Sequence, residues 1–242
     1  MRILITNDDG YDAPGLLALY NAVSDLGDVF VGPPSECHSS KGHAVCTKTA
    51  IAVTEHDVDG IGQVHAIHSS PADCVRIAVQ QLMPEPPDLV LAGINPGANM
   101  GVDVYYSGTV AAAREAAIMG IPAIAVSTYV RQDVGFSWDD KTQLTAETVR
   151  RLVEIGIRPG EFWNLNLPAV PSGQQPKGLE FTRQSTEAQG VSFEPHPDQP
   201  NAYRFTGDYS KRPAQQDADV RAVFDGFVSA SLLHLDTTAP QT

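Results

Sequence analysis

The amino-acid sequence predicts an α/β fold: a doubly wound, mostly parallel, Rossmann-like sheet with a C-terminal β-hairpin appendage. Short apolar runs within 3–5, 88–92 and 121–127 are typical of strands that are buried on both faces. Between the strands lie segments with helical spacing of apolar or alanine residues, such as 13–26 and 110–120. This alternation favours parallel strands joined by right-handed crossovers.

The first half of the chain begins with a strand at 3–5 that ends in the acidic turn Asn7–Gly10. A helix over 13–26 follows, and Pro14 is acceptable in its first turn. Ser70 before Pro71 is a favourable start for a later helix. In order, we expect a strand at 28–31, a loop at 32–43, short strands within 44–53 and 64–68, and a helix from 69 through 82.

The middle of the chain repeats this pattern. In order, we expect a strand at 88–92, a helix that follows the sequence YYSGT and ends near 120, a strand at 121–127, a helix at 144–155 and a strand at 164–168.

After Pro168 the sequence becomes polar and rich in proline and glutamine, with short strands expected at 179–183, 202–207 and 227–235. We therefore divide the chain into an α/β core, 1–168, and a C-terminal extension, 169–242, with a β-hairpin arm and a closing strand. An arm of this kind is more suited to contacts between subunits than to folding alone. We expect a homodimer or homotetramer that uses residues from about 171 to 218.

Composition excludes several classes of protein. The formal net charge of −13 and the pI of about 4.8 argue against binding to a nucleic-acid duplex, which needs a basic surface. We expect no membrane partner, because no apolar run approaches the roughly 18 residues of a spanning helix. The three cysteines lack C-x-x-C spacing, and no signal-peptide pattern is present, so we expect a cytoplasmic protein.

Two adjacent acids, Asp8 and Asp9, follow the first buried strand. Ligands of open α/β sheets bind at the carboxyl ends of strands, and two neighbouring carboxylates there repel each other unless a cation compensates. For an arbitrary pair of acids, a turn with capping carboxylates is the more common explanation. The position of this pair favours a divalent cation, Mg²⁺ or Mn²⁺, which prefers oxygen ligands.

Three later segments offer further polar groups, each with a structural alternative. Ser39, Gly42 and His43 lie in a loop that supplies a hydroxyl and groups for phosphate or proton transfer; an ordinary polar loop is the alternative. Asn95 follows an apolar strand and offers a carbonyl oxygen without charge, or simply belongs to a turn. The segment Ser107–Gly108–Thr109 opens a helix, where free N–H groups bind anions, although a helix cap explains it equally well.

These motifs together resemble the SurE family of stationary-phase survival proteins, which are metal-dependent 5′/3′-nucleotidases. The matching segments are MRILITNDDG at the N-terminus, Ser39 with Gly42–His43, SPADCV at 70–75, AGINPGAN at 92–99, YSGTVAAAREA at 106–116, GIPAIAVS at 120–127 and NLNLP at 164–168. The sequence departs from the family pattern at His38, Ser40 and Ala116, and in the segment 217–220.

The resemblance implies one divalent metal ion per subunit, held by Asp8, Asp9, Ser39 and Asn95. It also implies a phosphate site at the Ser107–Gly108–Thr109 turn. We include Asn95, Gly42 and His43 among the substrate-binding residues.

Our hypothesis is a phosphomonoesterase that hydrolyses nucleoside 5′- and 3′-monophosphates to nucleoside and phosphate. Short polyphosphate is a further substrate that the resemblance implies. Either Asp8 or Asp9 orients the attacking water, and the sequence leaves open which one does. One alternative is a phosphatase with an aspartyl-phosphate intermediate, although its usual D-x-D arrangement is absent. Another is a nucleotide-binding regulatory protein without turnover.

Overall fold

The computed structural model describes residues 1–188 and 190–239 and is built around a seven-stranded sheet. In spatial order the strands are β2 (Asp28–Val31), β1 (Arg2–Thr6), β5 (Leu89–Pro96), β6 (Ala123–Thr128), β7 (Glu161–Leu167), β11 (Val228–His234) and β8 (Leu179–Phe181). The first five strands of this order are parallel, β11 runs antiparallel to β7, and β8 is parallel to β11. The predicted doubly wound, mostly parallel sheet is confirmed.

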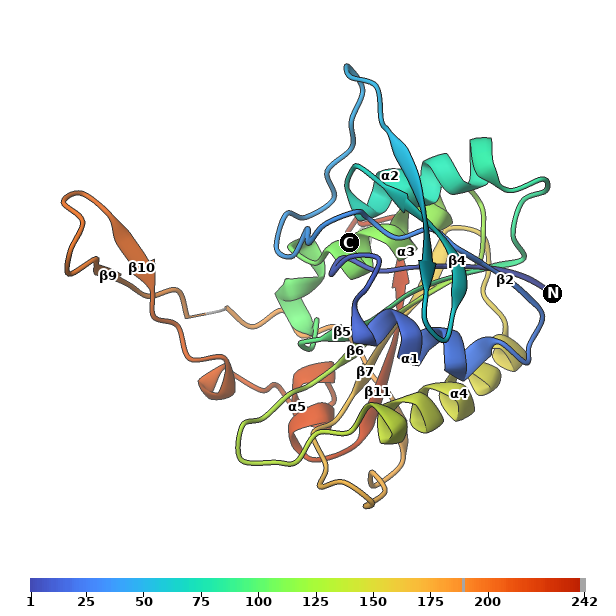
Figure 1. Cartoon of the computed structure of the whole chain (residues 1–242). Helices are drawn as coiled ribbons and strands as arrows, with labels where there is room; N and C mark the ends of the chain where they lie inside the picture. The colour runs from blue at the N-terminus through green and yellow to red at the C-terminus, as the bar shows by residue number, and fades with distance from the viewer. Residues whose placement is uncertain (189, 240–242) are drawn as a thin grey trace.

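Two pairs of helices cover the two faces of the sheet (Figure 1). One face packs against α1 (Pro14–Val23) and α4 (Trp138–Ile155), and the other against α2 (Pro71–Ile77) and α3 (Gly108–Ile118). Successive side chains of a strand point to opposite faces, so the apolar run of β1 serves both cores. Within residues 1–188 and 190–239, none of the helices reaches the length and apolarity needed to cross a bilayer.

The strand order places a topological switch point between β1 and β5. The chain winds from β1 to β2 on one side and continues through β5, β6 and β7 on the other. In open α/β sheets the crevice at such a point is the usual ligand site. The register of β5 against β6 shifts between Ala92 and Asn95, where Gly93 has a φ of +142°. A Cβ on Gly93 would lie 2.2 Å from the Val126 carbonyl oxygen, so this strand path requires glycine.

Several elements differ from the sequence prediction. Residues 44–52 form a loop instead of a strand, because side chains at the start of α2 bind the loop backbone. The Cys46 amide donates to Asp73 Oδ2 (2.7 Å), and Ser70 Oγ donates to the Ala44 carbonyl (2.5 Å). The neighbouring hairpin is formed by β3 (Val53–Val58) and β4 (Gly62–Ile67).

Two helices also differ from prediction at their ends. The α-helix that begins at Pro71 ends at Ile77 and continues as a π-helix over Ala78–Leu82. The helix predicted from 144 begins earlier, at Trp138, because the Ser137 side chain accepts from the Asp140 amide (3.3 Å) and caps it.

The C-terminal part both completes the sheet and forms an arm. The predicted closing strand is β11, and β8 pairs beside it at the sheet edge. The hairpin of β9 (Phe193–Pro195) and β10 (Tyr203–Phe205) extends away from the body of the molecule (Figure 1). The division at 168 as a domain boundary stays a prediction, and residues 189 and 240–242 of the extension lie outside the described residues.

Helix α5 (Asp219–Phe224) connects this C-terminal part to the core through one buried carboxylate. Asp219 Oδ2 accepts from the Gly101 amide (2.7 Å), and Oδ1 accepts from the amides of Ser185 (3.0 Å) and Val220 (2.8 Å). These bonds join three segments that are distant in sequence. Short 3₁₀ helices at Gly101–Tyr105 and Tyr209–Lys211 flank the same region.

We predict that Asp219→Ala lowers the free energy of unfolding by about 2–4 kcal/mol, because it leaves buried amides without an acceptor. Urea denaturation measures this change. The control Asp225→Ala removes an exposed carboxylate that pairs with Arg221 at the other end of α5, and it is expected to cost less than about 1 kcal/mol. Equal effects of the two substitutions would contradict the anchoring role of Asp219.

Candidate functional site

A cavity of about 520 Å³ lies at the switch point of the sheet. Five of the predicted site residues line it: Asp8, Asp9, Ser39, Asn95 and Ser107. They come from the turn after β1, the loop after β2, the end of β5 and the start of α3. The chain therefore brings oxygen-bearing side chains from four separate segments to one edge of the sheet.

Asp8 is buried, with 3% of its surface exposed, and lies against the N-terminus of α3. Thr109 Oγ1 donates to Asp8 Oδ1 (2.5 Å), and backbone hydrogen bonds to Gly108 and Thr109 also stabilise the carboxylate. Burial raises the pKa of Asp8, and these hydrogen bonds oppose the rise. A Cβ on Gly108 would lie 2.7 Å from the Asp8 Cβ, so the close contact requires glycine at this position.

Asp9 is less deeply buried and borders the same cavity. Burial, followed by the neighbouring charge of Asp8, raises the pKa of Asp9 to about 6. The two carboxylates are therefore destabilised in their charged forms, which is the electrostatic condition that a bound cation relieves.

Ser39 and Asn95 add neutral oxygens to the two carboxylates. Asn95 Nδ2 donates to the Gly97 carbonyl (2.5 Å), which fixes the amide and leaves Oδ1 without a hydrogen bond to the described residues. Ser39 Oγ lies 3.1 Å from Cys37 Sγ, and the His38 amide donates to the Asp8 carbonyl (2.7 Å), which ties this loop to the end of β1. An all-oxygen donor set fits Mg²⁺ or Mn²⁺.

The described part of the chain has no metal site made of ionisable side chains alone. No group of three or more His, Cys, Asp or Glu residues is placed there to hold an ion. An ion at the switch point would therefore depend on serine and asparagine as much as on Asp8 and Asp9.

The three residues of the predicted phosphate site have different surroundings in the structure. Ser107 borders the cavity, and its Oγ accepts from the Val110 amide (3.0 Å) as the cap of α3, so its hydroxyl hydrogen remains available to a ligand. Thr109 is fully buried behind Asp8, with its hydroxyl engaged by that carboxylate, and Gly108 packs against the same side chain. Of the three residues, Ser107 alone is among those that line the cavity.

Gly42 and His43 do not line the cavity. The Gly42 amide donates to the Tyr106 carbonyl (2.9 Å), and His43 Nε2 lies 2.7 Å from Glu115 Oε2 on α3. Both contacts attach the loop that carries Ser39 to the segment that carries Ser107. Gly42 and His43 therefore help to position the site and do not border its cavity.

Sequence reasoning missed the asparagines that support the wall of the cavity. Asn99 lines the cavity, and its amide donates to Asn166 Oδ1 (2.9 Å) while its Nδ2 donates to Ser127 Oγ (2.7 Å). Asn164 Nδ2 donates to the Asn99 carbonyl (2.8 Å). The sequence did contain a signal for this support: Asn164 and Asn166 are alternate residues of one strand and therefore lie on the same face of the sheet.

A second missed group comes from the C-terminal part. The Tyr209 hydroxyl lies 2.8 Å from both the Ala98 carbonyl oxygen and Asp103 Oδ2, and Arg212 forms an ion pair with Asp103. Arg212 Nη2 also donates to the Met100 carbonyl (3.2 Å). These contacts hold the segment 98–103 beside the cavity, and no local motif in the sequence predicts them.

The fold and the cavity define a Rossmann-like α/β protein with oxygen donors gathered at the switch point of its sheet. Comparison with known proteins specifies the family. A family model described as "Survival protein SurE" matches residues 3–190. The chain belongs to the SurE family, and the predicted membership is confirmed.

Individual relatives agree with this assignment. The 5′-nucleotidase SurE of Desulfitobacterium hafniense is 37% identical over 241 residues, covering 98% of this chain and 92% of the relative. That of Syntrophobacter fumaroxidans is 44% identical over 184 residues, covering 76% and 72%. The crystal structure of the SurE protein from Aquifex aeolicus matches with a TM-score of 0.82 and 33% identity, covering 98% of this chain and 95% of that chain.

We predict that Asp9→Asn stabilises the protein at pH 7 in the presence of EDTA. Because the folded-state pKa of Asp9 is raised from 3.8 to about 6, its contribution to stability is full below pH 3.8 and is lost as pH rises through about 6. The melting temperature of the variant, relative to wild type, should therefore rise by about 2–6 °C between pH 4 and pH 7.

Thermal unfolding followed by circular dichroism measures this difference. Asp12→Asn, in the exposed part of the same turn, should show no such pH-dependent difference. A constant offset between Asp9→Asn and wild type across this pH range would refute the electrostatic interpretation.

Proposed function

We propose that this chain is a metal-dependent nucleotidase, a phosphomonoesterase that hydrolyses nucleoside 5′- and 3′-monophosphates to nucleoside and phosphate. The observation that carries the proposal is the gathering of Asp8, Asp9, Ser39 and Asn95 around one cavity beside the N-terminus of α3. Relatives with the printed name 5′-nucleotidase SurE support the reaction class. Short polyphosphate, a chain of the same phosphate groups, is proposed as a further substrate.

One divalent ion per subunit, Mg²⁺ or Mn²⁺, would be held by Asp8, Asp9, Ser39 and Asn95. When bound, such an ion neutralises phosphate oxygens and lowers the pKa of a water. The remaining roles belong to the chain itself. Thr109 fixes the orientation of Asp8, and the hydroxyl of Ser107 is placed to donate to a phosphate oxygen at the positive end of α3.

The reaction is a direct displacement at phosphorus. Water attacks in line with the leaving ribose oxygen, the P–O bond to ribose breaks, and the nucleoside leaves with a proton. Asp8 is held by Thr109, whereas Asp9 is less deeply buried and borders the cavity. We therefore propose that Asp9, whose carboxylate borders the cavity and is not engaged by Thr109, orients the water and accepts its proton.

Two rival functions predict different experimental results. A regulatory protein would bind AMP without releasing phosphate. A phosphatase with a covalent intermediate would become labelled on Asp8, whose carboxylate Thr109 already engages.

We predict metal-dependent release of phosphate from AMP and GMP, abolished by EDTA and restored by Mn²⁺. Asp8→Asn and Asn95→Ala should each lower kcat/KM by about 100-fold or more, because metal charge stabilisation is worth several kcal/mol. The control Asp12→Asn should retain activity, since Asp12 is exposed and does not line the cavity. Full activity of either site variant with Mn²⁺ would contradict the proposed metal site.

We propose that the protein acts in the cytoplasm. Cys37, Cys46 and Cys74 are all unpaired, as expected in a reducing compartment such as the cytoplasm. Nucleoside monophosphates are proposed as the substrates there.

We further propose that the hairpin arm of β9 and β10 mediates a homodimer or homotetramer. The arm exposes large apolar side chains: Val191 at 68%, Phe193 at 57%, Tyr203 at 69% and Phe205 at 57%. The rings of Phe193 and Phe205 contact each other edge to face, with centroids 5.6 Å apart. An apolar patch of this kind on an extended arm is typical of a surface that is covered by another subunit.

We predict that light scattering at micromolar concentration gives the mass of a dimer or tetramer. The double substitution Phe193→Ser with Tyr203→Ser should shift the protein towards the monomer. The control Phe136→Ser removes another exposed aromatic residue outside the arm and should leave the mass unchanged. A monomeric wild-type protein with full activity would refute this proposal.

A further inference from the structure

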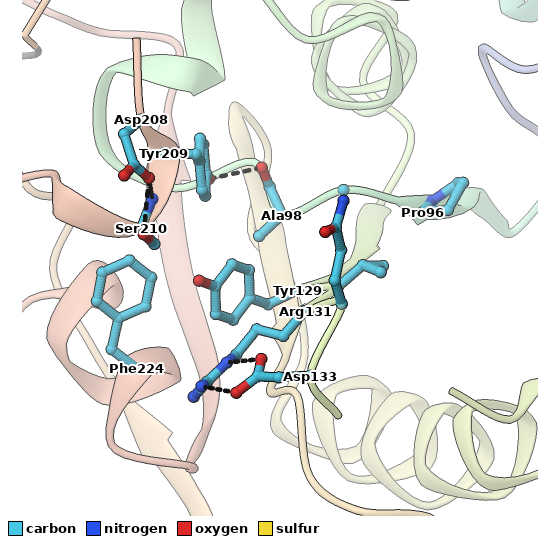
Figure 2. A pocket seen from close by; sticks show the side chains of 12 residues that line it. Pro96, Ala98, Tyr129, Arg131, Asp133, Asp208, Tyr209, Ser210 and Phe224 are labelled. Carbon is cyan, nitrogen blue, oxygen red and sulfur yellow. Dashed lines mark hydrogen bonds and ion pairs between the residues drawn. The ribbon is translucent and has the colours of Figure 1, made fainter. Parts of the chain in front are cut away.

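A second cavity, of about 800 Å³, lies next to the cavity that holds Asp8 and Asp9. The two cavities share Pro96, Gly97, Ala98 and Tyr209, so one backbone ridge, residues 96–98, separates them. Figure 2 shows Tyr209 bound to the Ala98 carbonyl on this ridge, with Tyr129 and Phe224 beyond it. We propose that the second cavity is the nucleoside subsite and that Tyr129 stacks against the base, with purines preferred. This inference rests on the proposed nucleotidase function.

Aromatic side chains form one wall of this cavity. The ring centroid of Tyr129 lies 5.1 Å from that of Phe224 and 6.0 Å from that of Tyr209, with interplanar angles of 33° and 37°. All three rings are partly buried, which leaves apolar ring surface available to a ligand. Base–aromatic stacking needs such a surface and tolerates every base, but a purine covers more of it.

The position of Tyr129 is fixed by the sheet. Tyr129 directly follows β6, and its amide donates to the Leu167 carbonyl at the end of β7 (2.8 Å). It therefore lies at the same carboxyl edge as Asn95, one strand further along. Asn95 and Ala98 are three positions apart in the sequence, at most about 11 Å of extended chain, a span that a nucleoside crosses.

Among its described lining residues, the second cavity lacks the groups that would bind a phosphate. Of the described residues that line the second cavity, Arg131 is the only cation, and Asp133 engages it through Nε (3.0 Å) and Nη2 (2.5 Å). Asp208 also lines this cavity, and hydrogen bonds from Lys211 and Ser210 lower its pKa to about 2. Because Arg131 is paired with Asp133, this cavity offers a phosphate group no uncompensated cation among its described lining residues, whereas the first cavity borders the N-terminus of α3. The phosphate therefore belongs beside α3 and the neutral part of the ligand belongs here.

The rim carries groups that recognise a base edge. Gln132 supplies both a donor and an acceptor, and Asp208 accepts from amino or hydroxyl groups. The hydroxyl of Tyr129 has no hydrogen bond to the described residues, and burial raises its pKa, so it stays protonated and able to donate. A large apolar wall with a few polar groups is the usual composition of a ligand site.

The test compares a substrate that has a base with one that lacks it. Tyr129→Leu should lower the ratio of kcat/KM for AMP to kcat/KM for ribose 5-phosphate by about tenfold, and Tyr129→Phe, which keeps the ring, should restore most of it. The matched control is Phe136→Leu, an aromatic residue in the same connection between β6 and α4 that packs on Trp138. It should leave the ratio unchanged, and thermal unfolding confirms that each variant is folded.

A binding measurement separates this inference from the proposed function. Wild-type protein should bind adenosine in a calorimetric titration, and Tyr129→Leu should bind it about tenfold more weakly. If wild type releases no phosphate from AMP, the nucleotidase proposal fails, and adenosine binding alone decides the subsite. A ratio within twofold of wild type, or equal adenosine affinity in wild type and Tyr129→Leu, overturns the subsite.

Discussion

The structure around the switch point depends on one electrostatic constraint, the placement of two adjacent carboxylates in a poorly solvated turn. Burial raises the pKa of both Asp8 and Asp9. The neighbouring segments compensate in part: Thr109 and the start of α3 supply hydrogen bonds to Asp8, and Gly108 allows the close approach. This compensation is incomplete for Asp9, so the turn keeps an affinity for positive charge.

The wall of the site is assembled from residues that are far apart along the chain. Asn166 and Ser127 hold Asn99, while Tyr209 and Arg212 hold the segment 98–103 from the C-terminal side. The C-terminal part therefore does more than carry an arm, since its own contacts shape both cavities. Changes in this part are therefore expected to affect the site as well as the arm.

The sequence was sufficient to predict the elements that depend on local or periodic patterns of residues. The strand at 28–31 and the buried strands that deliver Asp8 and Asn95 follow from short apolar runs, and strand ends in a parallel sheet share one edge. The roles of His43 and Thr109 could not be predicted, because their partners Glu115 and Asp8 lie 72 and 101 residues away. The place of Tyr129 beside a cavity could not be predicted either, because its ring partners Tyr209 and Phe224 come from the C-terminal part of the chain.

The ridge between the two cavities has an evolutionary consequence. It is formed largely by the backbone of residues 96–98, whereas the wall around Tyr129 and Gln132 is formed by side chains from another strand connection. If the second cavity binds the nucleoside as proposed, substitutions in that connection would change which molecule is recognised without displacing Asn95 or the two acids that follow β1. The architecture thus allows ligand preference to diverge among descendants of one ancestor while the chemical centre is inherited intact.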